Sequence, residues 1–335
     1  MTRRKEDAYA FPCAVIRSNE KTLLSAADLT RVLDAKQFNG AMNILGEFGY
    51  GDGKELANPR EFEKVLRAEL SRVYDLVFSV VPDRTELELF LYPNDYHNAK
   101  VLLKAEFLGI DPAPYMVTTG AIEPEKLAQM VKERNMAFLS LEMKHAIEEA
   151  IDMFSKGRDP QEIDIILDRA CYRDMLSAAE AAGNEFIIGY VKLLIDILNV
   201  NTFIRLREIG KPWAFFQKVF LEGGAIDERT FTGSYEESYQ QLADKLAPYG
   251  FREVFASGAV AVRDTKKYTL LEKLCDDMKI KYVKDAHYVS FGIEPVMGFL
   301  IGKESEIKNL RVILTGKLAG TAPEVIKERL RETYV

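Results

Sequence analysis

The sequence has few of the residues on which metal and disulfide chemistry depends. Its 335 residues include three cysteines, three histidines and one tryptophan. The cysteines, Cys13, Cys171 and Cys275, stand far apart and form no CxxC pair. An odd number of scattered cysteines predicts free thiols in a reducing compartment rather than a disulfide framework. Cys171 and Cys275 lie in apolar helical contexts, so we expect both to be buried.

The histidines do not form a metal-binding pattern. None stands three or four residues from another histidine or cysteine; they are His97, His145 and His287. Asp95, His97 and Asn98 are usable cation ligands. However, the later copies of this stretch, described below, carry Leu198 and Lys308 where the histidine's end of the motif lies. We therefore expect these residues to be structural and predict no metal site.

No nucleotide-binding signature is present. Gly223-Gly224 lacks a following Gly-Lys-Ser/Thr, and Gly316-Lys317 is followed by a leucine within a helical pattern. Gly49, Gly51 and Gly53 follow no predicted strand and indicate a loop. Without a phosphate loop or a dinucleotide fingerprint, the chain is a poor candidate for phosphoryl or hydride transfer. No cofactor is expected.

Charge and hydropathy exclude two further classes. The formal net charge is −7, with acids and bases mixed along the chain, which argues against binding nucleic acid by phosphate neutralisation. The most basic run, Arg3-Arg4-Lys5, is short, and no signal-peptide stretch follows it. The most apolar window, Phe186–Val200, contains Lys192 and Asp196 and falls short of the ~20 residues that a membrane span needs. We expect a soluble chain that meets a membrane only through partners.

What the sequence does contain is a threefold repeat. The stretch Tyr92–Gly109 has an acid fourteen residues, and an asparagine eleven residues, before its final glycine. The three copies of this pattern are Asp95, Asn98 and Gly109; Asp196, Asn199 and Gly210; and Glu306, Asn309 and Gly320. The glycines are 210 − 109 = 101 and 320 − 210 = 110 residues apart. Each copy has helical periodicity, and the glycine suits the left-handed position that ends a helix.

Two further landmarks recur. Asn58-Pro59-Arg60-Glu61 and Asp159-Pro160-Gln161-Glu162 both lie 51 residues before the glycine of their copy, and both are typical helix starts. GAIEPE, from Gly120, is echoed by GAIDER, from Gly224. The period is far above the 20–50 residues of a solenoid, so each unit should be a small helical bundle. We predict three units, at about residues 1–125, 126–228 and 229–335.

Helical patterns cover most of the chain, and sustained strand alternation is hard to find. The predicted class is therefore all-α. The main predicted helices are Tyr9–Ser18, a helix capped at Ser25, Phe38–Phe48, Asn58–Val81, Pro124–Phe154, Asp159–Ala182, Glu185–Ile209, Trp213–Leu221, Ser234–Leu246, Thr265–Met278, Gly292–Lys303, Ser305–Leu318, and a terminal helix opened by a capping box at Thr321–Glu324.

The recurring acid and asparagine, three residues apart, share a helix face. Such residues usually lie in solvent. Alternatively, the pair points inward and binds backbone groups of an adjoining helix, because a buried polar group left unpaired costs ~1–3 kcal/mol. A catalytic acid is the third interpretation, but no partner base or nucleophile stands nearby. Recurrence in otherwise divergent sequence favours the inward pair.

At the repeat the sequence resembles a known family. LYPNDYHNAKVLLKAEFLG is similar to the ND-x-HN-x-x-x-LL-[KR]-A segment of the C subunit of prokaryotic V/A-type rotary ATPases, the counterpart of the d subunit in the eukaryotic vacuolar enzyme. KESEIKNLRVIL (Lys303–Leu314) resembles that family's KE-x-E-x-x-NLR segment, and FFQKVFLEGGAI its Gly-Gly stretch. AVIRSNEKTLLSAADL and EFGYG match its opening.

The resemblance implies a funnel of three similar helical bundles around a pseudo-threefold axis. It implies a non-catalytic, peripheral central-stalk protein on the cytoplasmic face, which binds the shaft subunits (D and F type) and the membrane rotor ring and transmits torque. A torque coupler needs broad interfaces rather than a pocket. Aromatic residues that we expect to be exposed at unit ends are hypothetical contact points: Trp213, Phe216, Phe220 and Phe299.

Two alternatives belong to other classes. One is an all-helical enzyme with a carboxylate site built from Asp95, Asp196 or Glu306; one substitution should then abolish activity while the others leave it intact. The other is a generic helical scaffold, which would be recovered from solubilised membranes without ATPase or ring subunits.

Overall fold

The computed structural model describes residues 8–51, 58–157 and 159–335. All regular secondary structure within these ranges is helical, with no strand, which confirms the all-α class. Arg3-Arg4-Lys5 and Gly53 lie outside the described residues.

The chain divides into two compact units. The first combines Met1–Pro82 with Ser238–Val335, and the second is Asp83–Glu237. Sequence-distant ends thus belong to one unit. These boundaries differ from those predicted after residues 125 and 228, and the division into three bundles stays a prediction.

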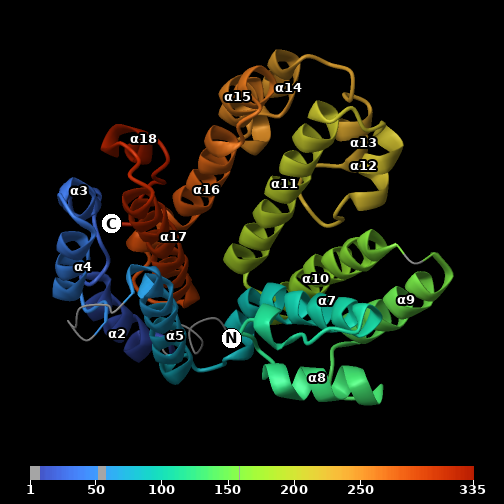
Figure 1. Cartoon of the computed structure of the whole chain (residues 1–335), viewed down its shortest axis with the longest axis horizontal. Helices are drawn as coiled ribbons and strands as arrows, with labels where there is room; N and C mark the ends of the chain where they lie inside the picture. Colours follow the sequence, from blue (N-terminus) through green and yellow to red (C-terminus); the bar gives the residue numbers. More distant parts are fainter. Residues whose placement is uncertain (1–7, 52–57, 158) are drawn as a thin grey trace. The chain divides into compact units, whose positions relative to one another are not determined.

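In the first unit the described helices come from both ends of the chain (Figure 1). They are α2 (Ala10–Glu20), α3 (Ala26–Asp34), α4 (Phe38–Glu47), α5 (Phe62–Val80), α14 (Tyr239–Lys245), a π-helical stretch (Val254–Ala259), α15 (Val260–Thr265), α16 (Thr269–Lys284), α17 (Ile293–Leu318) and α18 (Pro323–Lys327), with short 3₁₀ turns at Pro59–Glu61, Ala247–Tyr249 and Asp285–Tyr288.

The second unit contains the first two copies of the repeat, on α7 and α11. Its described helices are α6 (Thr85–Glu88), α7 (Tyr92–Leu108), α8 (Pro124–Glu133), α9 (Leu141–Gly157), α10 (Pro160–Ala182), α11 (Glu185–Glu208), α12 (Trp213–Val219) and α13 (Glu228–Thr232), with 3₁₀ turns at Leu89–Leu91 and Ala113–Tyr115.

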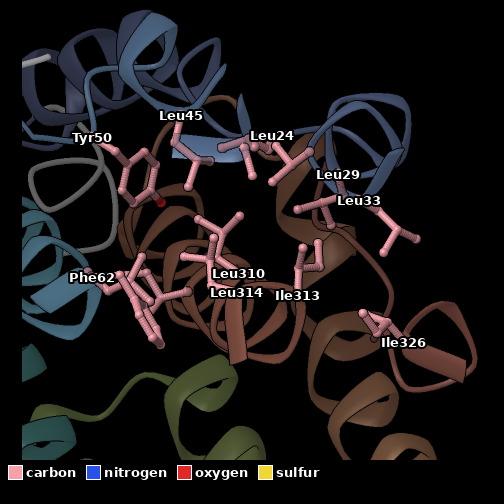
Figure 2. Close-up of a cluster of buried hydrophobic side chains, with 14 residues drawn as sticks. Leu24, Leu29, Leu33, Leu45, Tyr50, Phe62, Leu310, Ile313, Leu314 and Ile326 are labelled. Atoms are coloured by element: carbon pink, nitrogen blue, oxygen red, sulfur yellow. The ribbon is translucent and has the colours of Figure 1, made fainter. Parts of the chain in front are cut away.

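Helix α17 forms the centre of the first unit. Figure 2 shows Leu310, Ile313 and Leu314 of this helix between side chains of the N-terminal helices and of α5. The partners from the N-terminal part are Leu24, Leu29, Val32, Leu33, Ala41, Leu45 and Tyr50, and Phe62 and Leu66 come from α5. Burial of apolar surface, at about 25 cal/mol per Å², therefore holds the N-terminal helices and α5 to the last helices of the sequence.

The predicted helix ends hold where a local signal exists. Gly109, Gly210 and Gly320 all have left-handed φ, of 66°, 70° and 67°. Asn58 and Asp159 accept hydrogen bonds from the backbone of the second following residue. A capping box forms at Ser25, as expected. These ends are confirmed because side-chain caps and positive φ are local properties.

Three helix predictions were wrong. Pro124–Phe154 is two helices, because Arg134 takes a left-handed φ of 56° and ends α8. Gly292–Lys303 and Ser305–Leu318 are one continuous helix, α17. The capping box at Thr321–Glu324 does not form: α18 begins at Pro323 with no side-chain cap.

Helix α11 is longer than the apolar window Phe186–Val200, which was expected to be too short for a membrane span. Within the described residues it is one helix long and apolar enough to cross a membrane by length and composition. The central helix of a soluble protein meets the same criteria, and 56% of the apolar window of α11 is buried inside the protein. Asp196 and Asn199 in this helix are also buried. One such helix is weak evidence for a span.

Three of the four aromatic residues expected at exposed unit ends are buried. Phe216 and Phe299 have no exposed surface, and Phe220 is 6% exposed. The ring of Phe216 contacts those of Phe203 and Phe220 at centroid distances of 5.4 and 5.7 Å. The predicted exposure is therefore wrong for these three residues, because they form an aromatic core or lie within α17. Trp213 is 49% exposed.

Candidate functional site

The acid and asparagine of the first repeat bind one short backbone segment. Asp95, on α7, accepts the amide N–H of Ala121 and of Ile122, both at 3.1 Å. Asn98 accepts the N–H of Val117 through Oδ1 at 2.9 Å and donates Nδ2 to the same residue's carbonyl at 2.9 Å. Both side chains are buried. We call this arrangement of acid, asparagine and bound backbone a clamp.

The second clamp repeats the first bond for bond. Asp196, on α11, accepts the N–H of Ala225 at 2.9 Å and of Ile226 at 3.1 Å. Asn199 accepts the N–H of Leu221 at 2.9 Å and donates to its carbonyl at 2.8 Å. The inward interpretation of the acid and asparagine is therefore correct, although the bound backbone belongs to a non-helical segment rather than to an adjoining helix.

The third clamp draws its two partners from distant parts of the sequence. Asn309, on α17, accepts the N–H of Arg331 at 2.8 Å and donates to its carbonyl at 3.1 Å. Glu306 accepts the N–H of Leu24 at 2.5 Å. One continuous segment is bound in each of the first two clamps, whereas the third binds two segments that are 331 − 24 = 307 residues apart.

The three clamps share one feature of register. The residue bound by the acid lies two positions before the next helix in every case: Ile122 before α8, Ile226 before α13 and Leu24 before α3. Each acid therefore binds the backbone just before a helix start.

Glycine allows the aspartates to approach the backbone. A Cβ on Gly120 would lie 2.2 Å from Asp95 Oδ1, and one on Gly224 would lie 2.1 Å from Asp196 Oδ1. Both glycines stand four residues before the next helix, and the corresponding residue before α3 is Thr22. The third clamp has glutamate instead of aspartate.

The pKa values of the clamp aspartates are shifted by their surroundings. Burial raises the pKa of Asp95 to about 6, although the N–H groups of Ile122 and Ala121 act to lower it. Burial also raises the pKa of Asp196, against the same kind of backbone bonds. Desolvation penalises the charged carboxylate, and hydrogen bonds to it favour it. Because the oxygens are occupied by backbone donors, the geometry supports a positioning role for these acids.

The third clamp also contains a buried lysine. Lys303 is fully buried, and its Nζ lies 2.7 Å from Glu306 Oε1 and 3.2 Å from Glu69 Oε1 on α5. The hydroxyl of Tyr50 donates to Glu306, and burial, followed by the charge of Glu306, raises the Tyr50 pKa well above its ordinary value. Arg72 binds the other side of Glu69 at 2.7 Å. Lys303 and Arg72 together thus balance two buried carboxylates from different helices, and Lys303 touches both.

Other residues of the Lys303–Leu314 segment also bind the N-terminal part of the chain. Glu304 accepts a hydrogen bond from Tyr74 at 2.6 Å, and Arg311 donates to Glu63 at 2.8 Å. Tyr74 and Glu63 both lie on α5. Lys303–Leu314 is one of the segments that carry the family resemblance. Its polar side chains Lys303, Glu304 and Arg311 link α17 to α5.

The described residues offer little for metal or acid–base chemistry. Within residues 8–51, 58–157 and 159–335, no three His, Cys, Asp or Glu side chains are grouped to hold a metal. His97 Nε2 lies 3.1 Å from the carbonyl of Tyr115. A surface hollow of about 440 Å³ between α9 and α10 is lined by both acidic and basic side chains. Two of its cations are paired with its acids: Arg173 with Glu142 at 3.1 Å, and Lys218 with Glu162.

Sequence reasoning located the acids and asparagines but not everything they bind. Gly120 and Gly224 were recognised only as part of a recurring stretch, and that stretch contains the backbone bound by the two aspartates. Lys303, Glu69 and Tyr50 were missed, since Glu69 and Tyr50 are more than 200 residues from Lys303 in sequence and no local pattern links them.

Comparison with known proteins decides the family. Residues 12–329 match the family described as ATP synthase (C/AC39) subunit. The chain belongs to this family. It is 24% identical to the C subunit of the A-type ATP synthase of Methanocaldococcus jannaschii, over 96% of this chain and 86% of that protein. It is 24% identical to the C subunit of the V-type sodium ATPase of Enterococcus hirae, over 96% and 97%.

A third relative is the C subunit of the V-type ATP synthase of Thermus thermophilus. That protein is 25% identical to this chain over 97% of the chain and 98% of its own length. The resemblance seen in the sequence is therefore confirmed: this is an all-α chain of the family to which the C subunits of V/A-type ATPases belong.

Proposed function

We propose that the chain is a non-catalytic central-stalk subunit of a V/A-type rotary ATPase or ATP synthase. In this role it is a peripheral protein at the cytoplasmic face that receives the shaft subunits (D and F type) and rests on the membrane rotor ring. It transmits torque between them and binds no cofactor. Family membership supports the complex, and the clamps support the mechanical role.

The observation that carries the proposal is the recurrence of one clamp on three helices. Asp95, Asp196 and Glu306 each hold the backbone just before a helix. A shared construction predicts three similar bundles, arranged around a pseudo-threefold axis as a funnel. An adaptor of this kind works by shape, and its recurring polar groups serve packing rather than a reaction.

Rigidity supports the same role. A protein that passes torque must resist deformation, and polar groups that are buried and fully bonded fix a unique arrangement. In the clamps, each asparagine uses both its oxygen and its nitrogen on one backbone residue. The N-terminal part of the chain is fixed to α17 by bonds such as Arg311–Glu63 and Lys303–Glu69.

Co-purification tests the assembly. An affinity-tagged chain, recovered from detergent-solubilised membranes of its source, should bring shaft, ring and ATPase subunits with it. Recovery of the chain without ATPase or ring subunits would favour a generic scaffold. We expect partial loss of assembly from each of the variants Asp95→Ala, Asp196→Ala and Glu306→Ala. An activity that one variant abolishes and the other two leave intact would favour an enzyme.

Trp213 is the remaining candidate contact with a partner. It is half-exposed at the start of α12, and aromatic residues are enriched at interface cores. Trp213→Asp should lower recovery of shaft or ring subunits, whereas Trp213→Phe, which keeps an apolar ring, should retain most of it. Equal recovery with Trp213→Asp would remove this residue from the interface.

A further inference from the structure

The segment Arg329–Val335 has no regular secondary structure, yet it is bound along its length. Arg331 is held by Asn309, and its Nε lies 3.2 Å from Asp276 Oδ2 on α16. The N–H of Glu332 donates to Asp277 Oδ1 at 2.7 Å. The segment therefore follows α16 and α17 through polar contacts that do not depend on helix formation.

One side chain of the segment is buried, and a notch in α17 receives it. Tyr334 is 4% exposed. A Cβ on Gly302 would lie 2.8 Å from the Cβ of Tyr334, and one on Gly298 would lie 2.4 Å from its hydroxyl oxygen. The two glycines are four residues apart and so lie on one face of the helix. His287 covers the ring at a centroid distance of 4.1 Å, and its Nε2 lies 3.0 Å from the Tyr334 carbonyl oxygen.

The third clamp differs from the others in a way that leaves this segment separable. In the first two clamps the acid and the asparagine hold one continuous segment. In the third, Glu306 holds Leu24, and Asn309 holds Arg331. The contacts of Arg329–Val335 can therefore break while Glu306, Lys303 and Tyr50 keep the N-terminal helices on α17.

We propose that Arg329–Val335 is a latch on the first compact unit, anchored by Tyr334, that opens and closes as a step of its own. Opening exposes the Gly298–Gly302 face of α17 and frees both polar groups of Asn309. A segment without regular secondary structure, with one buried side chain, belongs to the low-stability end of a fold. The inference does not depend on the role in a rotary ATPase.

Hydrogen exchange of the intact chain tests the latch. The amides of Arg331 and Glu332 report the latch, and those of Leu24 and Ile122 report the third and first clamps. In the wild-type chain the latch amides should exchange with little dependence on low concentrations of urea, as local openings do, while the Leu24 amide should show a larger dependence.

Two substitutions should release the latch, and one should keep it. Tyr334→Ala removes the anchor, and Gly302→Ala fills the notch. Either should lower protection at Arg331 and Glu332 by at least about tenfold, with protection at Leu24 and Ile122 unchanged. Tyr334→Phe keeps the ring and should behave as the wild type.

Two results would overturn the proposal. One is wild-type protection at Arg331 and Glu332 in Tyr334→Ala. The other is exchange of the latch amides together with Leu24 at every urea concentration, which would make the segment an integral part of the core. The second measurement needs no variant, so it remains decisive if a substituted chain fails to fold.

Discussion

The ammonium group of Lys303 lies 2.7 Å from the carboxylate of Glu306, one helical turn away, in a part of the first unit with no solvent exposure of the lysine. Glu306 also binds the backbone that precedes α3, and Glu69 brings α5 to the same cation. The pair thus joins three segments that are distant in sequence. Removal of this pair should therefore destabilise the packing of all three segments.

Lys303→Met should destabilise the first unit by about 3–5 kcal/mol, because it leaves Glu306 buried without a cation and removes one of the two cations at Glu69, which keeps Arg72. Urea unfolding followed by circular dichroism measures the loss. Lys308→Met is the matched control on the same helix: Lys308 is 46% exposed, and its partner Asp276 keeps Lys279 and Arg331, so we expect a loss of only about 0–1 kcal/mol. Equal losses in the two variants would contradict the role of Lys303.

Gly120→Ala should destabilise the second unit by about 1–3 kcal/mol, because the new Cβ overlaps Asp95 Oδ1. The single tryptophan, Trp213, lies in this unit, so its fluorescence during urea unfolding reports the effect. Gly157→Ala, in the same unit with no atom near the added Cβ, is the control and should change stability little. A neutral Gly120→Ala would show that the clamp has room to move.

Asp95 should make the second unit less stable as the pH rises from about 4 to about 6. Its pKa in the folded state is about 6, above the ordinary 3.8, so the folded chain binds a proton that the unfolded chain has lost. Asp95→Asn should flatten this part of the pH dependence, whatever its effect on stability at a fixed pH. The difference between the two urea-unfolding profiles isolates Asp95, because other acids contribute to both. A parallel pair of profiles would contradict the raised pKa.

Asp276 should act with the opposite sign in the first unit. Burial acts to raise its pKa, but Lys279 and Lys308 outweigh burial and hold the pKa well below the ordinary 3.8. Its contribution is therefore present above about pH 4 and lost as the pH falls further. Asp276→Asn should reduce the acid sensitivity of the first unit, measured by circular dichroism between pH 5 and pH 2. An unchanged acid transition would show that Asp276 is not part of it.

Local signals in the sequence were sufficient to predict most helices and the acid and asparagine of each clamp. They did not predict the backbone residues that these side chains bind. Glycine ends and Asn or Asp caps act within a few residues, so Gly109 and Asn58 could be placed correctly. Two helices were predicted where α17 is continuous, and Glu69 and Tyr74, on α5, bind Lys303 and Glu304 at the predicted break. These partners lie over 200 residues away.

The same limit explains the aromatic residues. Phe216 and Phe220 were expected at exposed unit ends. Their burial depends on Phe203 and Phe231, from α11 and α13. The third clamp could not be predicted from local sequence either, since the backbone that it binds is divided between Leu24 and Arg331. Only the folded chain brings these two segments to one helix.

All three cysteines are buried: Cys13 and Cys275 in the first unit, Cys171 in the second. Burial raises the pKa of the Cys13 and Cys171 thiols, so the reactive thiolate is scarce in the native chain. A thiol reagent should therefore modify each cysteine only after the unit that contains it has opened. The mass added at each cysteine then gives the opening rate of each unit separately, and a cysteine introduced at the surface can carry a dye with little competing reaction from the natural three.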